Sequence, residues 1–240
     1  MGILSQATEI PRKTMVMFFV LDTSGSMEGD KIGSLNDAMR DIMPDLQDIS
    51  DSNADALIKI AVIDFASGTE WVTPLPQDLE TFRWTNLEAG GCTDLGEACR
   101  ELNAKLSRDQ FLADKVGNYA PVIILMSDGE PTDDFDGGLK ELKQNKWFQA
   151  AIKVAFAVGS DANKDKLAEF TGNKELVIPI MGKAMFKKMI RFVSVTSSKI
   201  GSQKAGGTDN ELQTKETALV EAIQSEMQEI DPEENIDEGW

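Results

Sequence analysis

One carboxylate and three hydroxyl side chains follow an apolar run near the start of the chain, where the sequence reads FFVLDTSGSM. Three of these four residues, Asp22, Ser24 and Ser26, are spaced two residues apart. Carboxylate and hydroxyl oxygens are ligands suited to Mg²⁺, Mn²⁺ or Ca²⁺ and are poorly suited to copper or zinc. Taken alone, the stretch is more typical of a helix N-cap turn, since Asp and Ser are favoured caps. A metal site therefore needs further oxygen donors from elsewhere in the chain.

Two other segments carry such donors. GGCTD, residues 90–94, precedes a predicted helix, and SDGEPTD, residues 127–133, follows a second apolar run. In an open α/β sheet, ligands bind outside the carboxyl ends of the strands, where the winding reverses. If the strands that precede DTSGS and SDGEPTD are neighbours, their loops converge. The sequence then predicts one divalent metal site whose ligands are Asp22, Ser24, Ser26, Thr93 and Asp128.

The proportion of hydroxyls in this predicted site has a chemical consequence. Only the two aspartates are charged, so a bound divalent ion keeps uncompensated positive charge. Such an ion should attract an anionic ligand, most simply an Asp or Glu carboxylate of a partner protein. Three further carboxylates, Glu130, Asp133 and Asp134, lie in the same loop as Asp128. We expect them to be solvated, with a supporting contact to the site as the alternative.

Alternating apolar runs and amphipathic segments must position these donors. Apolar runs predict strands at 14–21, 56–65, 70–73, 121–127, 152–158 and 175–180, and helical spacing predicts helices at 30–50, 94–106, 135–146, 161–170 and 185–195. Pro44 is expected to kink the first helix or to start a second one. This order predicts an α/β fold, a doubly wound, mostly parallel central sheet with helices on both faces and one short antiparallel edge strand at 70–73.

Composition excludes several classes of function. The net charge of −17 argues against nucleic acid and anionic membranes as partners. The chain has no His, which removes Ser-His-Asp triads and imidazole-ligated zinc. Cys92 and Cys99 are too few and wrongly spaced for a zinc knuckle or a redox pair. We find no secretory signal or membrane-spanning run, and we therefore expect a soluble, cytoplasmic protein.

Charge is distributed unevenly along the chain. Residues 196–240 hold 3 Lys or Arg against 11 Asp or Glu, nearly half of the excess negative charge. We therefore predict an N-terminal extension at 1–11, one domain at 12–195, and an acidic C-terminal tail at 196–240 that comprises a polar linker and a short helix at 211–230.

The combined motifs resemble a known family. DTSGSM, GGCTDLGEA and MSDGEPTDD, in this order and spacing, are similar to a von Willebrand factor type A domain with its metal-ion-dependent adhesion site. The family pattern, DxSxS followed by a Thr and then an Asp, maps onto the five donors named above. GGCTDLGEACRELN and LMSDGEPTDD most resemble the TerY-like bacterial subfamily. Cys92 stands where many members have a third glycine or another small residue, which leaves the ligand set intact.

The resemblance implies a function and leaves alternatives. It implies a Mg²⁺-dependent protein-interaction module and not an enzyme, with Mn²⁺ and Ca²⁺ as alternative ions. The TerY-like subfamily is associated with tellurium-resistance and stress-response operons, and a protein kinase or a PP2C-type phosphatase is the implied kind of partner. One alternative is a haloacid-dehalogenase-like phosphohydrolase, although Ser24 stands where that family usually needs a second Asp. Another is a structural scaffold with an empty site.

Overall fold

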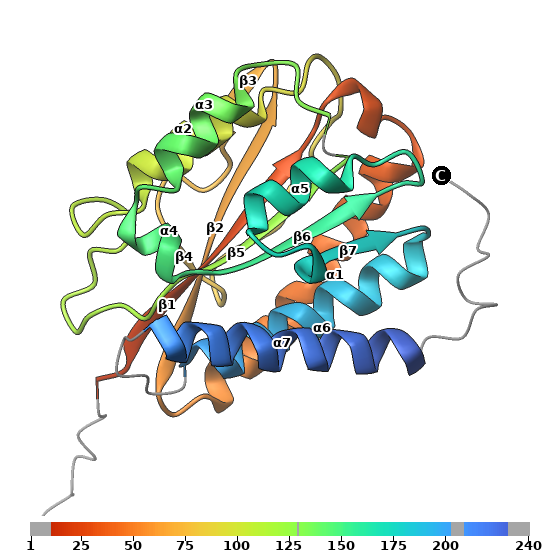
Figure 1. The fold of residues 1–240 in the computed structure, drawn as a ribbon. Helices are drawn as coiled ribbons and strands as arrows, with labels where there is room; N and C mark the ends of the chain where they lie inside the picture. Colours follow the sequence, from red (N-terminus) through yellow and green to blue (C-terminus); the bar gives the residue numbers. More distant parts are fainter. Residues whose placement is uncertain (1–10, 129, 203–208, 230–240) are drawn as a thin grey trace, which may run out of the picture.

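A central sheet of seven strands organises the chain in the computed structural model, which describes residues 11–128, 130–202 and 209–229 (Figure 1). Its strands are β1 (Lys13–Asp22), β2 (Ala56–Ala66), β3 (Gly68–Trp71), β4 (Gln77–Asp78), β5 (Val122–Ser127), β6 (Ile152–Val158) and β7 (Val177–Ile180). The strand order is β3-β2-β1-β5-β6-β7, and β4 also pairs with β2. β3 and β4 run antiparallel to β2, whereas the other pairings are parallel.

Helices cover both faces of this sheet, which confirms the predicted fold class (Figure 1). They are α1 (Asp30–Ser52), α2 (Leu95–Lys105), α3 (Phe135–Leu142), α4 (Lys146–Ala150), α5 (Lys164–Thr171), α6 (Lys183–Ser202) and α7 (Asp209–Glu229). The two faces arise because successive side chains of a strand point to opposite sides. In β1, Met17 and Phe19 pack in the core beneath α1, α6 and α7, whereas Phe18 and Val20 pack beneath α2 to α5.

Several local boundaries differ from the prediction. The predicted helix at 135–146 is two helices, because the Asn145 side chain accepts hydrogen bonds from the backbone N–H groups of Trp147 and Phe148 and so begins α4. α1 continues through Pro44 as one helix, so a second helix does not start there, and the alternative of a kink at Pro44 stays a prediction. The two-residue strand β4 pairs with Lys59 and Ile60 of β2 in the loop region 74–91, where the sequence predicted no strand.

The folded unit extends beyond the boundary predicted at residue 195. That residue lies inside α6, which continues to Ser202. The predicted helix at 211–230 is present as α7, and its side chains Leu219, Val220 and Ile223 are buried in the core beneath α6 and the sheet. Glu216 lies 3.8 Å from the buried ammonium of Lys153 on β6. α7 is therefore packed against the domain, whereas residues 1–10, 203–208 and 230–240 of the predicted extension, linker and tail lie outside the described residues.

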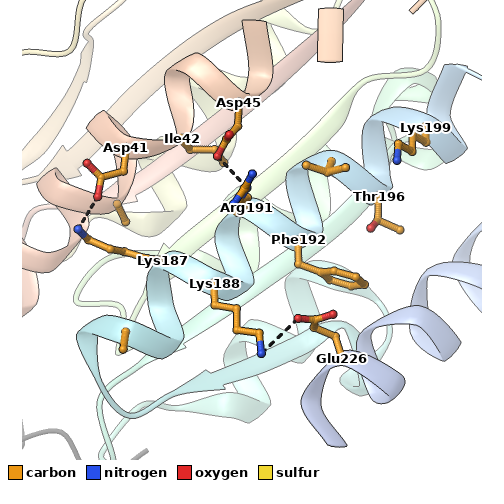
Figure 2. Close-up of a pocket in the computed structure, with 13 residues that line it drawn as sticks. Asp41, Ile42, Asp45, Lys187, Lys188, Arg191, Phe192, Thr196, Lys199 and Glu226 are labelled. Carbon is orange, nitrogen blue, oxygen red and sulfur yellow. Dashed lines mark hydrogen bonds and ion pairs between the residues drawn. The ribbon is translucent and has the colours of Figure 1, made fainter. Parts of the chain in front are cut away.

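A groove runs along the layer formed by α1, α6 and α7, with a volume of about 770 Å³ (Figure 2). Ion pairs cross it: Lys187 contacts Asp41, Arg191 Nε lies 2.8 Å from Asp45 Oδ2, and Lys188 Nζ lies 3.5 Å from Glu226 Oε1. Because these basic side chains already have acidic partners within the chain, the groove has no strong charge of one sign to offer a ligand.

Close helix packing on the other face yields a first prediction. A Cβ added at Gly138 of α3 would lie 2.2 Å from the Gly96 carbonyl oxygen of α2. We expect Gly138→Ala to lower the free energy of unfolding by about 1–3 kcal/mol, because two backbones would have to separate. Gly33→Ala is the matched control: this exposed α1 glycine has open space around it, and alanine should stabilise the helix by about 0.5–1 kcal/mol. Urea denaturation measures both, and equal values for the two variants would contradict the prediction.

Candidate metal site

The predicted ligands of the DTSGS segment lie at the carboxyl edge of the sheet. Asp22 ends β1 between β2 and β5, and its carboxylate is fully buried. Asp22 Oδ1 accepts a hydrogen bond from the Ser24 backbone N–H at 2.9 Å, and Oδ2 accepts one from the Ser127 hydroxyl at 2.5 Å. The Oγ atoms of Ser24 and Ser26 are 3.0 Å apart. The structure thus brings these three predicted ligands into one contiguous cluster.

The GGCTD loop is held against this cluster by its backbone. The Gly90 N–H donates to the Thr23 carbonyl at 2.8 Å, and the Gly25 N–H donates to the Gly91 carbonyl at 3.1 Å. Gly91 has a φ of 84°, a conformation that favours glycine. Thr93 follows it and is buried. These contacts bring the Thr93 segment to the same edge of the sheet as Asp22, as the sequence predicted for the loop.

A second contact fixes Thr93 from the opposite side. Its backbone N–H donates to the Thr132 hydroxyl at 2.9 Å, and its carbonyl accepts from the Thr132 N–H at 2.9 Å. Thr132 belongs to the SDGEPTD loop, which also carries Asp128. The GGCTD loop therefore contacts both the DTSGS segment and the SDGEPTD loop. All three predicted segments meet at this edge of the sheet.

Asp128 supplies the second carboxylate, next to the Ser127 that bonds Asp22. It is 5% exposed, and its Oδ1 is buried with no hydrogen-bond partner among the residues that the structure describes. Its Oδ2 lies 3.9 Å from the Lys31 ammonium, and its backbone carbonyl accepts from the Asn163 N–H at 2.6 Å. A buried carboxylate oxygen without a partner is costly, and a bound cation would remove that cost by coordinating it.

The electrostatics of the cluster favour a cation. The pKa of Asp22 is raised to about 6, mainly because the carboxylate is buried. Hydrogen bonds from Ser127 and Ser24 oppose this increase, and the nearby charge of Asp128 adds to it. Two adjacent buried carboxylates destabilise each other unless a positive charge lies between them. The donors present, two carboxylates and several hydroxyls, therefore fit a hard divalent ion. Within the described ranges, no group of three or more His, Cys, Asp or Glu side chains is arranged to hold a metal, so the candidate site depends on hydroxyl donors beside its two carboxylates.

The other loop carboxylates have structural partners. Glu130 and Asp134 are nevertheless exposed, as expected for solvated loop carboxylates, whereas Asp133 is partly buried. Asp133 accepts hydrogen bonds from the backbone N–H groups of Gly96 and Glu97, at 2.9 and 2.8 Å, in the first turn of α2. Asp134 caps α3 and pairs with Arg100 at 2.7 Å. Glu130 accepts from the Asn163 side chain at 2.9 Å. These contacts fix helix ends and loops around the site, and none of them involves a predicted ligand.

Sequence reasoning missed three residues whose side chains contact the predicted ligands. Ser127 bonds Asp22, Thr132 bonds Thr93, and Lys31 approaches Asp128. Ser127 could have been found, because it is the last strand residue before Asp128 and must face the neighbouring strand end. Lys31 carries no sequence signal, since its approach depends on how α1 is placed over the loop that follows β5.

Comparisons with known proteins agree with this fold. Residues 17–130, slightly under half of the chain, match the sequence model of the von Willebrand factor type A domain. The pilus adhesin SpaC from Lactobacillus rhamnosus GG is similar at 14% identity and a TM-score of 0.62, over 80% of this chain and 31% of that one. No curated protein matches the sequence.

Two further structures share the fold. Proximal thread matrix protein 1 from the mussel byssus, described with a zinc-occupied MIDAS motif, has 15% identity and a TM-score of 0.58 over 78% of this chain and 48% of its own. A von Willebrand factor type A protein from Catenulispora acidiphila has 16% identity and a TM-score of 0.56 over 78% and 43%. At these identities the likeness shows the fold alone, and this chain spans less than half the length of each of these structures. No helix in the described part of the chain could span a membrane.

Proposed function

We propose that this chain is a metal-dependent protein-interaction module in which Asp22, Ser24, Ser26, Thr93 and Asp128 hold one divalent ion. The observation that carries the proposal is the pair of buried carboxylates, Asp22 and Asp128, with one Asp128 oxygen that has no hydrogen-bond partner within the described ranges. Mg²⁺ is the ion we propose, because hydroxyl and carboxylate oxygens suit it. Mn²⁺ and Ca²⁺ are alternatives, and the zinc-occupied site of the mussel protein adds Zn²⁺ to the ions to be tested.

The ion would act by binding an acidic side chain of a partner protein. With only two charged ligands the ion keeps positive charge, and a partner carboxylate would complete its coordination. Ser24 and Ser26 are what distinguish this donor set from a fully anionic one, in which the ion would have little remaining attraction for an outside ligand. Charge-assisted contacts of this kind are about twice as strong as neutral ones. The activity proposed is therefore binding and not catalysis.

The cellular setting follows from the motif resemblance. GGCTDLGEACRELN and LMSDGEPTDD resemble the TerY-like subfamily, so we propose a cytoplasmic role in a bacterial tellurium-resistance or stress-response system. A protein kinase or a PP2C-type phosphatase is the proposed kind of partner. The net charge of −17 supports a protein partner over nucleic acid or an anionic membrane.

Metal binding is tested by thermal denaturation. A ligand that binds only the folded state stabilises it by about 2.7 kcal/mol at a hundredfold excess over Kd. For a domain of this size we expect a Tm about 5–10 °C higher in Mg²⁺ than in EDTA. The same scan with Ca²⁺, Mn²⁺ and Zn²⁺ ranks the ions. An unchanged Tm in all four, with no metal found by elemental analysis, would instead support an empty scaffold.

Partner binding is tested by affinity capture from a native cytosolic extract in Mg²⁺ and in EDTA. A partner retained only in Mg²⁺ supports the proposal, and replacement of its contacting Asp or Glu by the amide should then weaken binding by about 2–5 kcal/mol. A complex that survives EDTA with undiminished affinity would overturn the role of the ion. Mg²⁺-dependent hydrolysis of p-nitrophenyl phosphate would favour the phosphohydrolase alternative.

A further inference from the structure

A lysine ammonium lies near Asp128, one of the two site carboxylates. Lys31 is in the first turn of α1, and its side chain is only 12% exposed. Its Nζ lies 3.9 Å from Asp128 Oδ2 and 3.4 Å from Asp161 Oδ1. Asp161 belongs to the loop after β6, and its side chain is 74% exposed. The ammonium therefore lies between a buried carboxylate of the metal site and a solvated carboxylate outside it.

The loop after β6 provides the space that this ammonium occupies. A Cβ at Gly159 would lie 2.9 Å from Lys31 Cε, 3.0 Å from its Nζ and 2.9 Å from Asp161 Oδ1. Gly159 also has a φ of 93°, so a side chain there would be strained as well as crowded. The backbone of Asp128 is joined to this loop by the Asn163 N–H. Lys31, Asp161 and Asp128 thus share one small, closely packed region.

We propose that Lys31 competes with the divalent ion for Asp128 and thereby weakens metal binding. The inference rests on the proposed metal site. Without metal, the ammonium partly compensates the buried negative charge of Asp128. With metal, two cations lie near the same carboxylate and repel each other, and Asp161 offers the ammonium a second partner away from the ion. Metal affinity is then set by the position of Lys31 as well as by the five ligands.

The central test removes the charge and keeps the stem, with Lys31→Met. We expect Mg²⁺ to bind roughly tenfold more tightly by isothermal titration calorimetry, which corresponds to about 1.4 kcal/mol. The Tm in EDTA should fall, because Asp128 loses its compensating charge. Lys31→Gln is the second charge-removing variant if the methionine variant folds poorly, and Lys31→Arg should keep the weak affinity of the wild type.

Lys59→Met is the matched control. Lys59 of β2 is also partly buried and pairs with an aspartate, Asp78, at 3.2 Å. It lies six residues before Phe65, the β2 residue that is paired with Asp22. That spacing is about 20 Å along a strand, well beyond the Debye length of about 8 Å at physiological salt. Its loss should leave the Mg²⁺ affinity unchanged.

A double-mutant cycle distinguishes competition by Lys31 from a direct effect of the Asp161 charge on the ion. Asp161→Asn removes the alternative partner of Lys31, so the ammonium should remain closer to Asp128 and Mg²⁺ should bind about twofold to threefold more weakly. In the Lys31→Met background the same substitution should have no effect. An equal effect in both backgrounds would mean that Asp161 acts on the ion through its own charge, which contradicts the proposal.

The outcomes distinguish this inference from the proposed function. Tighter Mg²⁺ binding by Lys31→Met, with an unchanged Lys59→Met control, supports the competition. Binding by Lys31→Met but not by the wild type supports it more strongly. Equal affinity of wild type and Lys31→Met overturns the competition and leaves the metal site standing. Absence of binding by every variant overturns both.

Discussion

Asp22→Ala is expected to abolish the Mg²⁺-dependent rise in Tm and the Mg²⁺-dependent capture of a partner. Asp22 is fully buried at the end of β1, and both of its oxygens are oriented by hydrogen bonds, from the Ser24 N–H and the Ser127 hydroxyl. Removing one of only two charged ligands should weaken metal binding by more than about a hundredfold, since an ion pair of this kind in a buried site is worth several kcal/mol.

The fold of this variant should survive. Loss of the carboxylate removes the hydrogen bonds that Asp22 accepts from the Ser24 N–H and the Ser127 hydroxyl, at about 1–3 kcal/mol each. It also removes a buried charge whose pKa is raised by burial, which offsets part of that cost. Circular dichroism should therefore show native secondary structure in EDTA.

Asp64→Asn is the control for general loss of negative charge at this edge. Asp64 of β2 is paired in register with Leu21, next to Asp22, but its carboxylate accepts a hydrogen bond from Thr23. Burial raises the pKa of Asp64 as well. We expect this variant to keep most of the Mg²⁺ response. If Asp22→Ala bound the partner as tightly as the wild type, the metal would not be the contact.

Leu219→Ala is expected to lower the free energy of unfolding by about 2–5 kcal/mol, the usual range for truncation of a buried leucine. Leu219 of α7 is fully buried in the core cluster that also contains residues of α1, α6 and the sheet. The corresponding fall in Tm is roughly 5–15 °C for a domain of this size. A decrease of this size would show that α7, which lies in the region predicted as a tail, belongs to the cooperative fold.

Glu221→Ala is the matched control on the exposed face of the same helix. It should change stability by less than about 0.5 kcal/mol, as surface substitutions usually do. Chemical denaturation of both variants in EDTA keeps the measurement independent of metal. Equal, small effects of the two substitutions would show that α7 contributes little, and the domain would then end with α6.

The amino-acid sequence by itself determined the parts that depend on local pattern. The apolar runs before Asp22 and Asp128 are long enough to require buried strands, and alternation with helices requires parallel pairing with the loops at one edge. That is sufficient to bring DTSGS, GGCTD and SDGEPTD together, because the carboxyl ends of parallel strands share an edge. The absence of His and the excess of hydroxyls limit the chemistry independently of the fold.

Local pattern was insufficient wherever a side chain's partner is distant in the chain. Asp133 and Asp134 resemble any solvated loop carboxylates in sequence, yet they bond the start of α2 and Arg100. The weak apolar pattern of α7 becomes a packed helix only because Leu219 and Ile223 meet the face formed by α6 and the sheet.

Lys31 shows the same limit at the metal site. Its approach to Asp128 depends on the placement of α1 over the β5 and β6 loops and on the space left by Gly159. Burial and electrostatics at such positions are properties of the assembled layers, because they depend on contacts between residues far apart in the chain. Tertiary structure alone decides them.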